Sequence, residues 1–81
     1  MRVHVRLFAG IREAVGRSAV EIEVPEGATP EAVWQRLAAD HPELAGRRPS
    51  LSAAINRRYS AFDAVLRDGD EVVFVPPVSG G

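Results

Sequence analysis

The chain has 81 residues, no cysteine, a formal net charge of −1 and 46% hydrophobic residues. This length suits one domain that buries roughly 62% of its unfolded surface, and the composition is globular rather than disordered. The missing cysteines exclude disulfides, thiolate metal ligands and a cysteine nucleophile. The chain shows no basic face, no membrane-length apolar run and no signal-peptide core. We therefore expect a cytoplasmic protein that binds neither nucleic acid nor a membrane.

All ten basic residues are arginine, and Asn, Gln and Met are scarce. Scarcity of thermolabile residues is a thermophile trend, but lysine depletion is not part of that trend. A GC-rich codon bias is the simpler explanation, and we prefer it.

The N-terminal part predicts two strands joined by a short helical segment. Apolar and polar residues alternate over residues 2–8 and again over residues 19–24, as in strands with one buried face. Between them, helical spacing over residues 9–16 predicts one or two turns that stop at Gly16. We expect the two strands to form a hairpin.

One main helix is predicted after a turn at residues 25–27. Thr29 is a suitable N-cap, and Pro30 suits the first helical position. An apolar stripe continues to about residue 40, and Trp34 beside it is expected to pack in the core. Proline at position 42 prevents the helix from continuing.

The second half of the chain predicts a surface loop followed by strands. Two prolines and one glycine mark the loop. In chain order we expect a loop over 42–50, a strand over 51–56, a turn at 57–58, a short irregular strand over 59–66, a turn over 67–70 and a last strand over 71–75. These elements predict an α+β fold over residues 1–75, with a mixed four- to five-stranded sheet packed on one main helix.

Few side chains suggest catalysis or metal binding. His4 and His41 lie on different elements, and no acidic residue is spaced to complete a metal site with them. Asp68 and Asp70 flank a turn glycine, so turn hydrogen bonding accounts for them. The serines have no spacing that suggests a catalytic triad. The arginine pair at 57–58 either holds an anion or a partner carboxylate, or forms a solvated turn.

The last residues indicate a chemistry carried on the chain's own end. We expect residues 76–81 to form a flexible tail, in which Pro76 and Pro77 favour an extended start. Gly80 and Gly81 lack Cβ atoms, so they can thread a narrow channel in another protein. A terminal carboxylate there can attack the α-phosphate of ATP, and a sulfur nucleophile can then displace AMP. Because the chain has no Gly-rich phosphate loop, an external activating enzyme is expected to bind and consume the ATP.

Three internal segments, at 7–13, 53–56 and 66–72, and the ending at 74–81 carry a resemblance to a known family. The most specific part is the ending Pro76, Pro77, Val78, Ser79, Gly80, Gly81. On these residues the chain resembles ubiquitin-like sulfur carriers of the β-grasp fold, and more closely the small subunits of molybdopterin synthase. Thiamine-pathway carriers also end in Gly-Gly, but they are shorter and usually lack the Pro-Pro pair.

The resemblance implies a non-catalytic sulfur carrier for molybdenum cofactor synthesis, with no bound cofactor. An adenylyltransferase similar to ubiquitin-activating enzymes would activate the Gly81 carboxylate, and a persulfide donor would convert it to a thiocarboxylate. The tail over residues 76–80 would thread into the large subunit of molybdopterin synthase. There the sulfur would pass to a cyclic pyranopterin phosphate, and two charged carriers would be used for each dithiolene.

A partner surface is expected on the sheet face opposite the main helix. Phe8, Val73 and Val75 are out of phase with the buried residues of the first and last strands. If those strands are neighbours, as in β-grasp folds, the three side chains share the outer face, and Tyr59 can join them. The alternative is that they are isolated outward apolar residues, which are common on protein surfaces.

Other functions stay open from the sequence. The same carrier chemistry can serve a thiamine thiazole, a thiolated tRNA base or a protein lysine. A β-grasp interaction module with inert terminal glycines is a further alternative, for which removal of Gly80 and Gly81 changes nothing functional. A stand-alone enzyme is disfavoured, because no catalytic constellation is evident.

Overall fold

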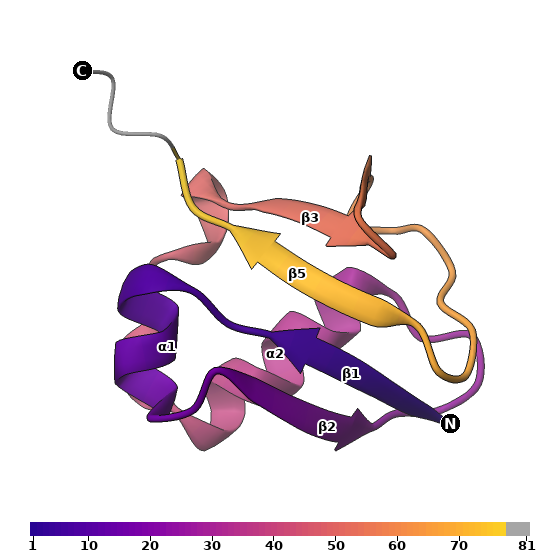
Figure 1. Ribbon diagram of the computed structural model, residues 1–81, viewed down its shortest axis with the longest axis horizontal. Coiled ribbons are helices and arrows are strands. Elements are labelled where there is room, and N and C mark those ends of the chain that lie inside the picture. Colours follow the sequence, from indigo (N-terminus) through magenta and orange to yellow (C-terminus); the bar gives the residue numbers. More distant parts are fainter. Residues whose placement is uncertain (78–81) are drawn as a thin grey trace.

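The computed structural model describes residues 1–77, in which five strands form one sheet and a helix crosses one of its faces (Figure 1). The strand order is β2-β1-β5-β3-β4. The strands are β1 (Arg2–Arg6), β2 (Ala19–Glu23), β3 (Ser52–Ile55), β4 (Arg58–Ser60) and β5 (Glu71–Val75). The helices are α1 (Ala9–Val15) and α2 (Pro30–Asp40), with two 3₁₀ turns, η1 (Pro42–Leu44) and η2 (Arg48–Ser50).

The sheet is mixed, as predicted. β5 runs parallel to β1, whereas the pairs β1–β2, β3–β5 and β3–β4 are antiparallel. The expected pairing of the first two strands is confirmed, with α1 in the connection between them. The predicted stop at Gly16 is also confirmed, because this glycine adopts a left-handed conformation with φ of 84° and its N–H donates to the Arg12 carbonyl.

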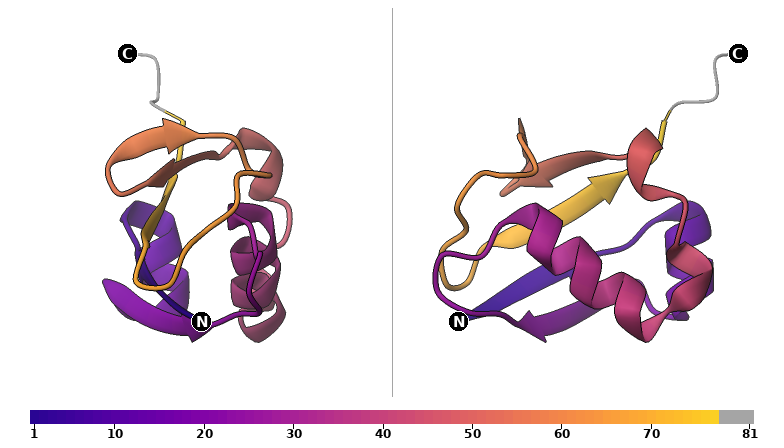
Figure 2. Two further views of the ribbon diagram at one scale, coloured as in Figure 1. Left: turned by 90° about the vertical axis from the view of Figure 1, so that its right-hand side faces the viewer. Right: turned by 180° about the vertical axis from the view of Figure 1, so that it is seen from behind.

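Helix α2 forms where the sequence predicts it, and it covers one face of the sheet (Figure 2). The Thr29 hydroxyl accepts a hydrogen bond from the Ala32 N–H at 3.2 Å, and Pro30 occupies the first turn. Trp34 is buried and meets Phe74 of β5 edge to face, with 5.1 Å between the ring centroids. The predicted packing role of Trp34 is therefore confirmed.

Alternation along the two central strands separates the core from the outer face. Val3 and Val5 of β1 and Val72 and Phe74 of β5 are buried beneath α2. Residues between them in sequence point to the other side, because successive side chains of a strand alternate. The outer face of β5 thus carries Glu71, Val73 and Val75.

The expectation of a plain surface loop over 42–50 is wrong. This segment contains η1 and η2, each with a proline in its first turn, and Leu44 is fully buried in the core. Prolines and glycine mark a break in the helix, but the same residues also suit a single 3₁₀ turn.

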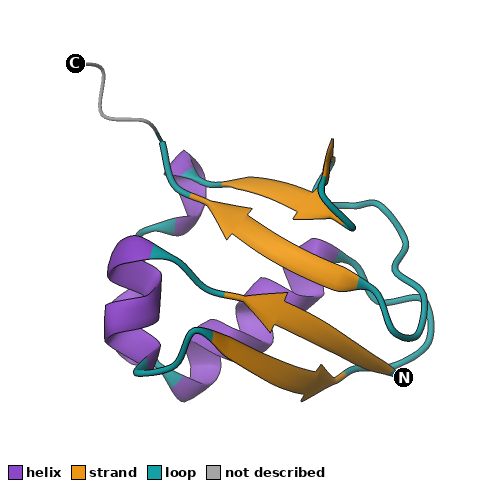
Figure 3. Ribbon diagram, viewed as in Figure 1, coloured by secondary structure: helices purple, strands orange, loops and turns teal. Residues whose placement is uncertain are grey.

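The expected strand over 59–66 and the expected turn at 57–58 are also wrong. The turn residues are Asn56 and Arg57, both with positive φ, and β4 covers only Arg58–Ser60. The chain from residue 61 to residue 70 is a loop without strand pairing (Figure 3). From this loop, Leu66 is buried in the core and Phe62 packs against it. Their even-numbered spacing in the sequence resembles the spacing of buried residues on a strand, which explains the wrong prediction.

No helix within residues 1–77 is long and apolar enough to span a lipid bilayer.

Candidate functional site

The four partner-binding residues predicted from the sequence lie together on the outer face of the sheet. Phe8, Tyr59, Val73 and Val75 line one hollow of about 290 Å³. A larger hollow of about 520 Å³, over β1 and β2, is lined by none of them. The predicted clustering is therefore observed, whereas a binding role for these residues stays a prediction.

Strand register explains how these side chains meet. Arg6 of β1 lies beside Val73 of β5, which lies beside Ala54 of β3, which in turn lies beside Tyr59 of β4. This row crosses the sheet on the face away from α2. Because the Ala54 side chain is small, it leaves space between its larger neighbours, and that space is part of the hollow.

Exposure of large apolar side chains is concentrated at this hollow. Within residues 1–77, the exposed large hydrophobic residues are Phe8 at 47%, Tyr59 at 75% and Val65 at 67%. Two of these three line the hollow, and Val65 does not. An apolar surface with a polar border is typical of a protein interaction site.

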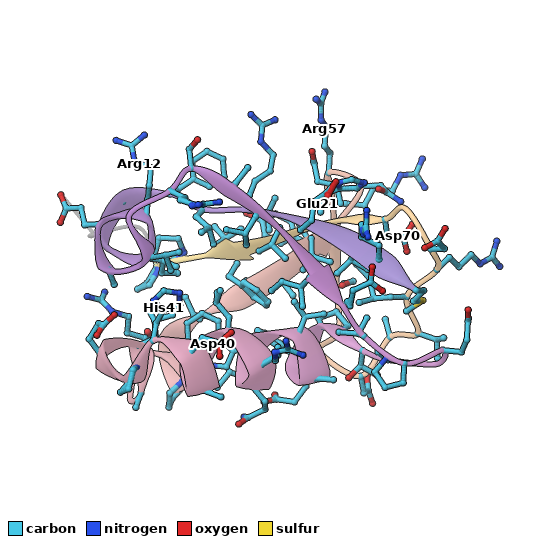
Figure 4. All side chains as sticks on the ribbon, turned by 90° about the horizontal axis from the view of Figure 1, so that it is seen from below. Arg12, Glu21, Asp40, His41, Arg57 and Asp70 are labelled. Atoms are coloured by element: carbon cyan, nitrogen blue, oxygen red, sulfur yellow. The ribbon has the colours of Figure 1, made fainter. Side chains whose placement is uncertain are left out.

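Charged side chains border the hollow on one side. Glu71 lies between two guanidinium groups, with 3.8 Å from its Oε2 to Arg6 Nη1 and 3.9 Å from its Oε1 to Arg57 Nε. Arg57 projects from the sheet on the side away from α2 (Figure 4). The sequence analysis missed Arg6 and Glu71, because only the pairing of β1 with β5 brings them to the apolar residues.

Asp68 and Asp70 serve the turn before β5. Asp68 Oδ1 accepts a hydrogen bond from the Arg2 N–H at 2.8 Å. Asp70 accepts two, from the Arg67 N–H at 2.8 Å and from Asn56 Nδ2 at 2.9 Å. The turn interpretation is confirmed for Asp70, whose bond from Arg67 lies within the turn, whereas Asp68 ties the turn to Arg2 at the start of β1.

The two histidines lie apart, each near one carboxylate. His4 Nδ1 is 3.2 Å from Glu21, and His41 Nδ1 is 3.7 Å from Glu43. Across the described residues, no group of three or more metal-ligating side chains of the His, Cys, Asp or Glu type is present.

Glu31, whose carboxyl pKa is shifted by its neighbours, lies away from the hollow. Arg48 contacts Glu31 Oε1 through Nε at 2.7 Å and Nη2 at 2.6 Å, and Gln35 donates to the other oxygen at 2.8 Å. The hydrogen bonds from Arg48 and then Gln35 hold the pKa of Glu31 below its ordinary value. Because Arg48 also stacks on the Phe62 ring at 3.4 Å, this cluster ties η2 and the loop to α2.

The predicted tail begins directly after β5. Pro76 is half-buried and Pro77 is exposed, so the chain leaves the sheet from the strand that carries Val73 and Val75. Val78, Ser79, Gly80 and Gly81, which the sequence analysis assigned to tail threading and sulfur chemistry, lie outside the described residues.

Comparison with known proteins matches residues 5–81 to the ThiS family. The molybdopterin synthase sulfur carrier subunit of Escherichia coli (strain K12) is 44% identical, over 98% of this chain and 99% of its own length. Small archaeal modifier protein 3 of Haloferax volcanii is 34% identical, over 100% of both chains. Among solved structures, SAMP1 from Haloferax volcanii is 28% identical and superposes with a TM-score of 0.88 over 100% of both chains.

These matches cover whole chains, so they concern the complete fold rather than a shared motif. They confirm the ubiquitin-like β-grasp fold and the sulfur-carrier family that the sequence resembles. The thermophile trend in the composition finds no support in them.

Proposed function

The chain belongs to the ThiS family, and on that premise we propose that it is the sulfur carrier of a molybdopterin synthase. The observation that carries this proposal is the 44% identity to the Escherichia coli sulfur carrier subunit over nearly the whole of both chains. The family match also extends through the Gly-Gly ending. The apolar hollow beside β5, the strand that leads into the tail, supports the same assignment.

The reactive group in this proposal is the carboxylate of Gly81. On a separate activating enzyme, one carboxylate oxygen attacks the α-phosphate of ATP, which forms an acyl adenylate and releases pyrophosphate. The terminal sulfur of a persulfide then displaces AMP to give an acyl disulfide. A thiol attacks the S–S bond of that acyl disulfide, so the thiocarboxylate leaves and the donor becomes a disulfide.

Transfer to the pterin takes place on the large synthase subunit. The thiocarboxylate sulfur attacks a carbon of the cyclic pyranopterin phosphate and displaces the oxygen bound to that carbon, so a C–S bond forms as a C–O bond breaks. Water then hydrolyses the resulting thioester. This step regenerates the Gly81 carboxylate and leaves one sulfur on the product, so each dithiolene consumes two carriers. A tethered thiocarboxylate supplies sulfur at high local concentration, without free sulfide.

The outer face of the sheet is the docking face for the large subunit in this proposal. The hollow offers an apolar contact through Phe8, Tyr59, Val73 and Val75. Val75 is followed directly by Pro76 and Pro77, so docking here would aim the tail into the partner. Because β5 connects the docked domain directly to the tail, docking would hold the start of the tail near the partner. Less conformational entropy is then lost when the rest of the tail binds.

Deletion of Gly81 tests the carrier function. We expect the truncated protein to keep its thermal stability, because the deletion lies beyond β5, and to form no product with the activating enzyme, sulfur donor, large subunit and pterin substrate. Appending one glycine should also block product formation, because the carboxylate then moves by a residue length of about 3.5 Å. A normal rate of product formation by the truncated protein would refute the carrier function.

Protein modification is the second candidate, favoured by the 34% identity to small archaeal modifier protein 3. In that case the activated Gly81 carbonyl is attacked by a lysine amine of a target protein, and an isopeptide bond replaces the acyl adenylate. The two functions are separated by the product. Lysines that carry the tryptic fragment of residues 68–81, which follows the last arginine of the chain, indicate modification in digests of host protein, whereas a sulfurated pterin indicates sulfur transfer.

A further inference from the structure

We propose that Arg57 is a specificity-determining residue of the docking face, where its guanidinium receives a carboxylate of the protein partner. The inference deepens the proposed function and rests on it, because it concerns the surface on which the large subunit would dock. Three observations carry it: the backbone of the turn, the charges around Glu71 and the position of Arg57 at the hollow.

The backbone at Arg57 is unusual for its side chain. Asn56 and Arg57 form the two-residue turn between β3 and β4, with φ of 50° and 71°. Hairpin turns with positive φ at both positions favour Asn followed by Gly. Asn56 follows that preference, but Arg57 keeps a long side chain where glycine would fit without strain. A strained residue at a surface turn points to a role for its side chain beyond the turn itself.

The charges around Glu71 do not cancel locally. Its one carboxylate faces both Arg6, at 3.8 Å, and Arg57, at 3.9 Å. Both distances exceed that of a hydrogen bond, so neither arginine is held tightly. His4 lies beside Glu71 in the register, but its Nδ1 faces Glu21 at 3.2 Å. Two guanidinium groups and one carboxylate therefore leave an excess positive charge at this border of the hollow.

Arg57 is placed to use that charge on a partner. Its side chain is 82% exposed, it lines the hollow, and it projects away from α2 (Figure 4). A partner that inserts an apolar side chain between Phe8 and Tyr59 would bring its neighbouring residues over this border. A carboxylate there matches the excess positive charge, and exclusion of water by the apolar contact strengthens the attraction.

Arg58 provides a matched control for the loss of an arginine. Arg58 pairs with Ile55, which packs against the core, so Arg58 lies on the opposite side of the sheet from the hollow. Replacing either arginine removes one positive charge at neighbouring positions. Only Arg57→Gly removes it from the docking face.

The test measures the dissociation constant of the purified large subunit for three carriers, together with their thermal stability. We expect Arg57→Gly to melt at the same or a higher temperature than the wild type, since glycine suits the turn. We expect its Kd to rise about tenfold at low salt, with a weaker salt dependence than that of the wild type. Arg58→Ala should leave Kd within about twofold.

The possible outcomes distinguish a failure of the role proposed for Arg57 from a failure of the proposed carrier function. If the wild type binds the large subunit and Arg57→Gly binds equally well, the role of Arg57 is refuted and the carrier function stands. If Arg58→Ala weakens binding to the large subunit as much as Arg57→Gly does, the role of Arg57 is also refuted, because the change in net charge alone would then explain the effect. Saturable binding of inorganic phosphate to the free carrier, lost in Arg57→Gly, would show a site for free anions instead. If the wild type does not bind the large subunit, the proposed function and this inference fail together.

Discussion

At the scale of single residues, the alternation of side chains along an extended segment decides whether a residue belongs to the core or to the proposed docking face. Leu7 is buried, whereas Phe8, one position later, is 47% exposed and lines the hollow. This phase is visible in the sequence, so Phe8, Val73 and Val75 could be predicted. Arg6 and Glu71 could not, because their place beside the hollow depends on which strands pair and in which register.

Replacing Phe8 tests the docking face. Phe8→Asp places a charge in an apolar contact, so we expect it to weaken binding to the large subunit by about 2 kcal/mol, or roughly thirtyfold in Kd. Because Phe8 is on the surface, the melting temperature should change little. Binding is measured by isothermal titration calorimetry on the purified proteins.

Val65→Asp is the control for that experiment. Among the exposed large apolar side chains of residues 1–77, Val65 is the one that lies outside the hollow. The Val65→Asp variant should bind like the wild type. An unchanged Kd for Phe8→Asp, or an equal loss for both variants, would show that the large subunit docks elsewhere.

At the scale of elements, periodicity predicts well those segments that pack along their whole length. β1, β2 and β5 bury alternate residues and α2 buries helically spaced ones, and the sequence shows both patterns. The wrong predictions concern segments that contact the core through only one or two side chains. Leu44, Phe62 and Leu66 anchor 3₁₀ turns and a loop, and isolated anchors have no period to detect.

The contact between η2 and α2 gives the fold a pH-dependent component. Arg48 and Gln35 hydrogen-bond the Glu31 carboxylate and lower its pKa in the folded state. A carboxyl whose pKa is lowered on folding stabilises the fold above its unfolded pKa. That stabilisation is lost as the pH falls from the ordinary Glu value of 4.5 through the lower folded value.

Glu31→Gln tests this contact. We expect the variant to melt about 2–5 °C below the wild type at pH 7, since the pair is partly exposed. The difference should shrink as the pH is lowered below the ordinary Glu value, because the wild-type carboxyl is then protonated as well. Glu26→Gln, at an exposed turn, serves as the control for charge removal alone. A difference between Glu31→Gln and wild type that stays constant with pH would contradict the account.

At the scale of the whole molecule, the topology puts the proposed docking face and the start of the tail on one strand. β5 lies in the middle of the sheet, contributes Val73 and Val75 to the hollow of the proposed docking face, and is followed directly by Pro76 and Pro77. Because β1 and β5 are parallel, the chain leaves β5 at the end of the sheet opposite Met1 (Figure 1).

The central claim is that Gly81 carries sulfur, and intact mass spectrometry tests it most directly. The purified chain is incubated with ATP, an activating enzyme and a persulfide donor, beside a variant that lacks Gly81. We predict a gain of about 16 Da on the wild type, the replacement of one oxygen by sulfur, localised to Gly81 and absent from the variant. No gain on the wild type, with an activating enzyme shown to charge another carrier, would contradict the claim, as would an equal gain on the variant without Gly81.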